Sequence, residues 1–261
     1  MRDTPPPGID TTVPSPARLY DYVLGGRENY AVDRQFAEKL LAQAPELRQT
    51  ALYNRAFLRR AVTLLADQGV DQFLDIGSGL PTVENTHEVA QRVNPDARIV
   101  YVDNDPSVVV HARALMEGQG SVEFVRGDAR DVPGILNAPG TRSLIDFERP
   151  VAALLVAVLH FVADEEDPAR IVADLAGACP PGSHVVLAHA TTEDCDPRLQ
   201  AHIEESYANS PTTTLRLRSR SAIEVMLTKV EPGLVQAHQW RVAEPPDGGP
   251  LRVLAGVARV D

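Results

Sequence analysis

The sequence predicts an α/β protein whose mostly parallel sheet is covered by helices on both faces. From about residue 73 to residue 188, short apolar runs alternate with helical patterns, which is the order expected for strand–helix–strand units. The run 151–158 is apolar throughout, as a strand buried on both faces should be. A glycine turn, Gly77-Ser78-Gly79, directly follows the first strand, so the backbone there can approach a ligand closely.

Length and charge limit the class of protein. The chain has 261 residues, enough for one large domain or a core domain with added helices, and a net charge of −11. Such an acidic chain repels phosphate backbones, so we expect no nucleic-acid partner. The longest apolar run, 151–159, is too short to span a membrane, and residues 1–7 lack the apolar stretch of a signal peptide. Two cysteines are too few for a disulfide scaffold, so we expect a cytoplasmic protein. We expect it to be a monomer or a homodimer.

The N-terminal part predicts an arm followed by three helices. Residues 1–16 are rich in proline and have little to bury, which is typical of a flexible arm. The first helix is expected at 17–24 and the third at about 45–68. Between them, Asp33 is expected to cap the start of the second helix. The inward face of the third helix is defined by steps of three and four residues: Leu47, Ala51, Asn54, Leu58, Ala61 and Leu65.

Five strands and three helices then alternate. The strands are expected at 73–76, 98–103, 122–125, 151–158 and 184–188, and the helices near 86–92, 106–117 and 167–178. Strands connected in this way are parallel, so their carboxyl ends meet at one edge of the sheet. That edge is where open α/β sheets bind small molecules.

Two further strands are expected near 235–242 and 252–260, after a helix at 221–229. The turn between them is rich in proline and glycine, which predicts an antiparallel hairpin at the edge of the sheet. The polar segment 196–220 precedes them. Its last arginines alternate with leucines and predict an edge strand with a charged outer face: Arg216, Arg218 and Arg220.

Three carboxylates follow consecutive strands. Asp75 stands two residues before the first glycine of the turn, Asp103 ends the second strand, and Asp128 lies just beyond the third. A dinucleotide fingerprint needs a third glycine where Thr82 stands, and Asp75 would repel a pyrophosphate. Asp75 instead suits a cationic amine or sulfonium, Asp103 a ribose diol, and Asp128 an exocyclic amine. S-adenosylmethionine (SAM) carries all three groups, although each carboxylate alone also fits an ordinary turn or solvated loop.

The glycine turn, Asp103 and Gly127-Asp128 resemble the class I SAM-dependent methyltransferases. More narrowly, the chain is similar to a bacterial family of S-adenosyl methyltransferases whose substrate is unassigned. This resemblance spans roughly residues 15 to 260 and rests on six blocks: 17–26, 54–58, 72–82, 101–106, 159–161 and 181–183. Pro81 departs from the general class pattern, which often has a glycine there, but it fits the narrower family.

The resemblance implies a Rossmann-like class I methyltransferase fold, with a seven-stranded sheet to which the C-terminal hairpin supplies the antiparallel strand. It divides the chain into the arm (1–16), a helical cap (17–68) and a SAM-binding core (69–261). The residues that it implies for binding SAM are Asp75, Gly77, Ser78, Gly79, Asp103, Asn104, Asp128, Ala129 and Leu159. The methyl group is expected near 159–161, beneath the cap, where a small-molecule acceptor would bind.

His160 is the candidate catalytic base. A neutral imidazole could take a proton from a hydroxyl or amine, but a histidine that ends a buried strand and bonds to backbone is the simpler interpretation. Many methyl transfers need only proximity and alignment. Asn54, on an apolar helix face, must bond either to the cofactor or to backbone. Further candidates to meet cofactor or acceptor, which packing or a helix connection would also explain, are Tyr22, Arg27, Asn29, Tyr30 and Phe161.

No metal site is expected, because His184 and His189 fall on opposite faces of one strand and the two cysteines have no partner pattern. The sequence predicts a SAM-dependent methyltransferase that transfers a methyl group to oxygen, nitrogen or carbon of an unidentified small organic acceptor. Its product would be S-adenosylhomocysteine (SAH). A regulatory or partner protein that binds SAM or SAH without catalysis remains an alternative. An NAD(P)-dependent oxidoreductase is less favoured because of Asp75 and Thr82.

Overall fold

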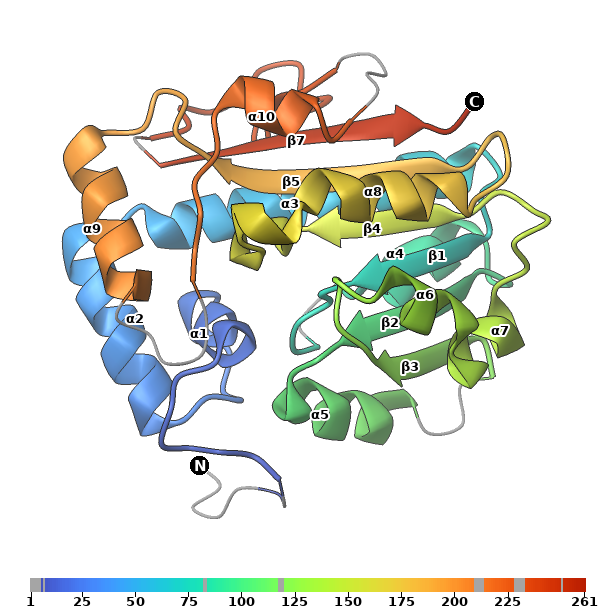
Figure 1. The fold of residues 1–261 in the computed structure, drawn as a ribbon, viewed down its shortest axis with the longest axis horizontal. Helices are drawn as coiled ribbons and strands as arrows, with labels where there is room; N and C mark the ends of the chain where they lie inside the picture. The colour runs from blue at the N-terminus through green and yellow to red at the C-terminus, as the bar shows by residue number, and fades with distance from the viewer. Residues whose placement is uncertain are drawn as a thin grey trace.

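A seven-stranded sheet forms the centre of the computed structural model (Figure 1). The structure describes all residues except 1–5, 7, 82–83, 117–119, 209–213, 228–232 and 250. The strands are β1 (Gln72–Ile76), β2 (Arg98–Asp103), β3 (Val122–Arg126), β4 (Ala152–Val156), β5 (His184–Thr191), β6 (Val235–Gln236) and β7 (Arg252–Arg259). Their order in the sheet is β3-β2-β1-β4-β5-β7-β6, and β7 alone of these strands runs against the others. The predicted mostly parallel α/β sheet is confirmed.

The central strands are buried on both faces, as their apolar sequence predicts. Every residue of β1 is buried, and Ala152 to Leu155 of β4 are fully inaccessible to solvent. Because β1 pairs with β2 on one side and with β4 on the other, the carboxyl ends of all three meet at one edge. This edge carries the glycine turn and the end of β2, so the sheet brings Asp75, Gly77 and Asp103 together.

Helices cover both faces of the sheet (Figure 1). One face packs against α6 (Val132–Asn137), α7 (Pro139–Leu144), α8 (Pro168–Gly177) and α10 (Arg220–Glu224). The other face packs against α3 (Leu47–Asp67) and α4 (Thr86–Val93), chiefly through Phe57, Leu65 and Val89. The helix α5 (Pro106–Met116) follows β2 and lies beside β3. This layering is the one that buries both apolar faces of a parallel sheet.

A third apolar cluster lies beyond the carboxyl ends of the strands. It joins α1 (Pro16–Val23), α2 (Ala31–Gln43), the first half of α3 and α9 (Pro197–Ala208). Its buried side chains include Leu19, Val23, Leu40, Ile203 and Tyr207. We call α1, α2, α9 and the first half of α3 the cap. The cap stands over the edge of the sheet to which the glycine turn belongs (Figure 1).

The start of the cap is fixed by buried polar contacts. Ser15 caps α1 through its side chain and also bonds to Asp105, next to the end of β2. Arg18 forms a buried ion pair with Asp33 at 2.8 Å and donates to Ser107 at 3.0 Å. Residues of the expected arm therefore make specific contacts, and Ile9 is buried. The division into arm, cap and core stays a prediction.

Four expectations about single elements were wrong. Helix α2 begins at Ala31, and Asp33 is its third residue, accepting a bond from the Tyr30 amide at 2.8 Å. The strand expected at 235–242 is only two residues long, because Trp240 turns back to pack edge-on against Phe57 with ring centroids 5.2 Å apart. The polar segment 196–220, in which no helix was expected, contains α9. The helix expected at 221–229 is α10, which ends at Glu224, and residues 228 and 229 lie outside the described residues.

The charged edge strand expected at the arginines did not form. Arg218 is buried, and its backbone makes a single parallel bridge to Thr191 at the end of β5. Leu215 and Leu217 are buried in the apolar cluster of the cap. The helices that the structure describes include none that is long and apolar enough to cross a membrane.

Candidate functional site

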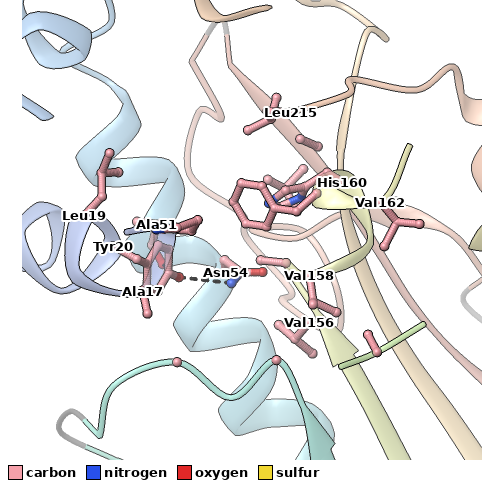
Figure 2. Close-up of a pocket in the computed structure, with 18 of the residues that line it drawn as sticks. Ala17, Leu19, Tyr20, Ala51, Asn54, Val156, Val158, His160, Val162 and Leu215 are labelled. Atoms are coloured by element: carbon pink, nitrogen blue, oxygen red, sulfur yellow. Dashed lines mark hydrogen bonds between the residues drawn. The ribbon is translucent and has the colours of Figure 1, made fainter. Parts of the chain in front are cut away.

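A cavity of about 700 Å³ lies between the carboxyl ends of the strands and the cap (Figure 2). Its two ends differ in chemistry. The polar end is formed by the loops after β1, β2 and β3 and includes Asp75, Asp103 and Asp128. The opposite end lies within the cap and is lined mainly by aliphatic and aromatic side chains. A site of this kind suits a ligand with one polar and one apolar half, or two ligands side by side.

The glycine turn shapes the polar end. Gly77 and Gly79 have φ values of +72° and +68°, a region that side chains other than glycine rarely adopt. A Cβ atom on Gly77 would lie 2.3 Å from a methyl group of Val158, so this glycine lets the turn pack on the end of β4. A Cβ atom on Gly79 would meet no atom within 4 Å. Gly79 therefore leaves free space beside the backbone, where a ligand can approach.

Asp75 and Asp103 are buried carboxylates at this end. Asp75 accepts a hydrogen bond from the Thr86 hydroxyl at 2.6 Å. Asp103 accepts from the amide of Gly79 at 2.9 Å and from that of Asp105 at 2.9 Å. Burial raises the pKa of each carboxyl group to about 6, and the hydrogen bonds only partly offset it. Buried carboxylates whose pKa is raised in this way favour a ligand that brings donors or a positive charge.

Asp128 is held differently from the other two carboxylates. Arg130 donates to it at 2.6 Å and 2.7 Å, and the Asn104 amide donates at 3.0 Å. The bonds from Arg130 are the main reason why the pKa of Asp128 falls to about 2. Asp128 is therefore charged at neutral pH, and it lines the cavity beside Ala129.

His160 lies on the wall between the two ends, in the short helix η1 (Leu159–Phe161) after β4. Its ring is buried and makes edge-on contacts with Phe161 at 4.4 Å and His189 at 5.6 Å between centroids. Burial, with help from the charge of Arg218, holds the pKa of His160 well below its ordinary value. The imidazole is neutral at pH 7, and its Nδ1 has no hydrogen-bond partner among the described residues.

Arg218 holds η1 in place. Its guanidinium donates to the carbonyl oxygens of Leu159 at 3.0 Å and Val162 at 2.7 Å, which flank His160. It also donates to Nε2 of His189 at 2.8 Å and twice to Asp164. These five contacts use all five N–H donors of the guanidinium. Sequence reasoning missed this role, because the acceptors come from a loop far away in the chain.

A pair of hydrogen-bonded polar side chains lies on the mainly apolar wall of the cap end. Nδ2 of Asn54, on α3, donates to the hydroxyl of Tyr20, on α1, at 3.0 Å. Tyr20 in turn donates to the carbonyl oxygen of Ala51 at 3.2 Å. Figure 2 shows this pair facing Val156, Val158 and His160 across the cavity.

The structure brings most of the predicted site residues together around one cavity. Those that line it are Asp75, Gly77, Ser78, Gly79, Asp103, Asn104, Asp128, Ala129, Asn54, His160 and Phe161. Sequence reasoning gave no site role to Tyr20, Ile203, Tyr207 or Leu217, which also line it. For α9 a signal was present, because Leu199, Ile203 and Tyr207 recur every four residues and form its buried face.

Five predicted site residues are absent from the cavity wall. Leu159 is fully buried in the core of one sheet face. Tyr22 donates to Glu38 at 3.0 Å, Asn29 donates to Asp21 at 2.9 Å, and Arg27 is exposed. The ring of Tyr30 lies under the guanidinium of Arg18. These residues therefore pack the protein or connect its helices, which is the simpler of the two interpretations that the sequence allowed.

The described residues include no group of three His, Cys, Asp or Glu side chains placed to hold a metal ion. The polar end instead combines the carboxylates of Asp75, Asp103 and Asp128 with backbone groups of the glycine turn, which suit an organic ligand rich in donors.

A model of the S-adenosyl methyltransferase family matches residues 2–261. The chain is 40% identical to a Thermobifida fusca protein, provisionally described as a methyltransferase, whose crystal structure has a TM-score of 0.91 and covers 98% of each chain. It is 37% identical to a DUF574 family protein from Streptomyces avermitilis, also with a TM-score of 0.91, over 97% of this chain and 99% of that one. Among curated proteins no match was found.

A more distant neighbour shows how general the fold is. The structure of human N-acetylserotonin methyltransferase in complex with SAM matches 92% of this chain and 61% of its own, with a TM-score of 0.51. At 17% identity the likeness is one of fold alone. It supports the predicted Rossmann-like class I arrangement of the sheet and its helices.

Proposed function

The chain belongs to the S-adenosyl methyltransferase family, and from this premise we propose that it methylates a small organic acceptor bound in the cap. The activity class is that of a SAM-dependent methyltransferase. One observation carries the proposal about the acceptor. A single cavity joins a polar end, built from the loops after β1, β2 and β3, to an apolar end inside the cap.

The polar end fits the three polar parts of SAM. The Asp103 carboxylate would accept from the two ribose hydroxyls, and Asp75 would face the amino-acid ammonium. Asp128 and the backbone of Ala129 would meet the adenine. The space beside Gly79, where a Cβ atom would meet nothing within 4 Å, admits the ligand close to the turn. When bound, SAM supplies an electrophilic methyl group on a sulfonium sulfur.

The chain's own contribution to the reaction is position and proton transfer. The cap residues and Phe161 would hold the acceptor in line with the methyl group and exclude water, which contributes through proximity and orientation. His160 lines the cavity with an unpaired Nδ1, which could accept the proton that a hydroxyl or amine loses as its new bond to carbon forms. Its lowered pKa makes it a weak base, so positioning of the acceptor is the larger contribution. Arg218 would act as a positioning residue, because it bonds to the two carbonyl groups that flank His160.

The experiment that tests the cofactor is a calorimetric titration with SAM, SAH and NADH. We expect SAM and SAH to bind and NADH not to bind. Asp103→Asn should weaken SAH binding by about 10- to 100-fold, because hydrogen bonds to a charged group are worth about 1.5–3 kcal/mol. Asp96→Asn, an exposed carboxylate outside the cavity, is the matched control and should leave the affinity unchanged. Binding of NADH alone would overturn the proposal.

Turnover separates an enzyme from a regulatory protein that only binds SAM. Transfer of a labelled methyl group to any small acceptor would support the proposed reaction. Tight SAH binding without transfer to any acceptor of a broad set would favour the regulatory alternative instead.

A further inference from the structure

Asn54 has a buried hydrogen-bond acceptor without a partner. Its side chain is only 4% exposed, and it lines the cavity from α3. Its Oδ1 atom is almost entirely buried and makes no hydrogen bond with any described residue. Because an unpaired buried acceptor destabilises a protein, such atoms are rare and call for an explanation.

Tyr20 fixes which end of the Asn54 amide is left unpaired. A tyrosine hydroxyl has one proton, and Tyr20 directs it to the carbonyl oxygen of Ala51 at 3.2 Å. The hydroxyl can therefore only accept from Asn54, which requires the Nδ2 group to face it, at 3.0 Å. The oxygen Oδ1 then points the other way. The hydrogen-bond network thus assigns the orientation of the amide.

The surroundings of Asn54 identify the kind of ligand that would pair with it. Figure 2 places Asn54 between Tyr20 and Ala51 of the cap and Val156 and Val158 at the end of β4. The wall beyond it is mainly apolar, and its apolar members include Leu19, Leu40, Ile203, Tyr207, Leu215 and Leu217. A ligand that occupies this end must be largely apolar. To satisfy Oδ1 it must also carry a donor at the position that Asn54 faces.

We propose that Asn54, oriented by Tyr20, recognises the X–H bond of a hydroxyl or amine on an otherwise apolar acceptor molecule. The inference rests on the proposed function and narrows the class of acceptor to molecules with a hydroxyl or an amine. A carbon nucleophile without such a donor would leave Oδ1 unpaired. Asn54 is thus a specificity-determining residue, and Tyr20 is the residue that positions it. Asp75 and Asp103 at the polar end already provide acceptors for the donors of SAM, so Asn54 is assigned to the acceptor molecule.

Matched pairs of probe molecules test whether Asn54 recognises a donor, with the protein loaded with SAH. Each pair shares an apolar ring body, and methyl groups replace the donor hydrogens of one member in the other: phenol and anisole, 1-naphthol and 1-methoxynaphthalene, 1-naphthylamine and its N,N-dimethyl derivative. Binding is measured by ligand-observed NMR titration. In the wild-type protein we expect the donor member to bind about fivefold or more tightly than its methylated partner, as one net hydrogen bond would give.

Two variants and one control locate the effect. Asn54→Leu keeps the branched shape of the side chain but removes its acceptor and its donor, so the ratio within each pair should fall to about 1. Tyr20→Phe removes the hydroxyl that fixes the Asn54 amide, so the amide can flip. The affinity ratio within each pair should then shrink while both members still bind. Thr50→Val is the control, because Thr50 lines the same wall but its hydroxyl already donates to Leu251 at 3.3 Å. Its ratio should match that of the wild type.

The outcomes that would overturn the inference are distinct from failure of the proposed function. SAH affinity is measured first for every variant. Absence of SAH binding in the wild type would sink the methyltransferase proposal itself. SAH binding with no donor preference, or with no probe bound at millimolar concentration, would overturn only the assignment of Asn54. So would an Asn54→Leu variant whose SAH affinity falls tenfold while the probe ratios stay unchanged.

Discussion

Burial is the main influence on the two carboxylates at the polar end of the cavity. The pKa of Asp75 and of Asp103 is about 6 in the folded protein, against an ordinary value of 3.8. The folded state therefore binds protons more tightly than the unfolded state between these values. Stability gained from protonation is present below about pH 4 and is lost as the pH rises through 6. At neutral pH both groups are mainly ionised and ready to accept hydrogen bonds.

This ionisation predicts the pH dependence of cofactor binding. Donors of SAH prefer the carboxylate form, so its affinity should rise from pH 5 to pH 7 and then level off. Each carboxylate with a pKa near 6 contributes up to about tenfold over that range. Calorimetric titration at four pH values measures the profile. Asp103→Asn should remove the contribution of Asp103 and leave that of Asp75, and a wild-type affinity that does not change between pH 5 and pH 7 would contradict these roles.

Arg218 gives a second prediction at the scale of one residue. Arg218→Ala would leave the carbonyl oxygens of Leu159 and Val162 without their donor, in a buried position. We expect the free energy of unfolding to fall by about 2 to 4 kcal/mol, since each unsatisfied buried group costs about 1–3 kcal/mol. Urea unfolding measures the change. Arg216→Ala, an exposed neighbour, should stay within about 0.5 kcal/mol. Equal effects of the two substitutions would argue against the role of Arg218.

Among the elements, α1 depends most on a single buried pair. Arg18 and Asp33 are both buried, and their ion pair at 2.8 Å connects α1 to α2. Arg18 also donates to backbone carbonyls of Asp10 and Val13 and to Ser107. One side chain thus connects the expected arm, the cap and the helix that follows β2.

We therefore expect Arg18→Met to destabilise the protein by about 3 to 5 kcal/mol, because it leaves the Asp33 carboxylate buried and unpaired. The change is measured by chemical unfolding. Arg27→Met is the control, because Arg27 is exposed on the neighbouring loop and should change the free energy of unfolding by less than about 0.5 kcal/mol. A similar small effect for Arg18→Met would show that α1 is held by its apolar contacts alone.

The elements differ in how well the sequence predicts them. Strands β1, β2 and β4 were predicted within two residues of their ends, because each contains a short apolar run that stands out from its neighbours. Strand β6 was overestimated, because the apolar residues after it pack into a turn around Trp240 instead of a ladder. The burial of Arg218 could not be predicted, because it depends on carbonyl groups that only the folded chain brings within reach.

For the site, the sequence predicts the polar end better than the cap end. Asp75, Gly79 and Asp103 follow consecutive strands, so the parallel topology alone brings them to one edge. The cap end is assembled from α1, α2, α3 and α9, whose relative placement no local pattern specifies. Tyr22 and Tyr30 were therefore chosen as candidates while Tyr20, on the same helix as Tyr22, lines the cavity.

At the scale of the whole molecule, cap and core share the cavity wall. If they also unfold together, SAH bound at the polar end at 100 times its dissociation constant should add about 2.7 kcal/mol to the free energy of unfolding of both. Thermal unfolding followed by calorimetry should show one transition that moves upward as a unit. If SAH moved only one of two separate transitions, the cap would not contribute to its binding.

The central claim is that SAM binds where the glycine turn, Asp103 and Asp128 meet, with its sulfur directed toward the cap. A crystal structure of the protein with SAH tests this most directly. We expect the ribose hydroxyls on Asp103, the adenine beside Asp128 and Ala129, and the sulfur facing the part of the cavity that Asn54 and His160 line. SAH bound elsewhere, or with its sulfur turned away from the cap, would contradict this account.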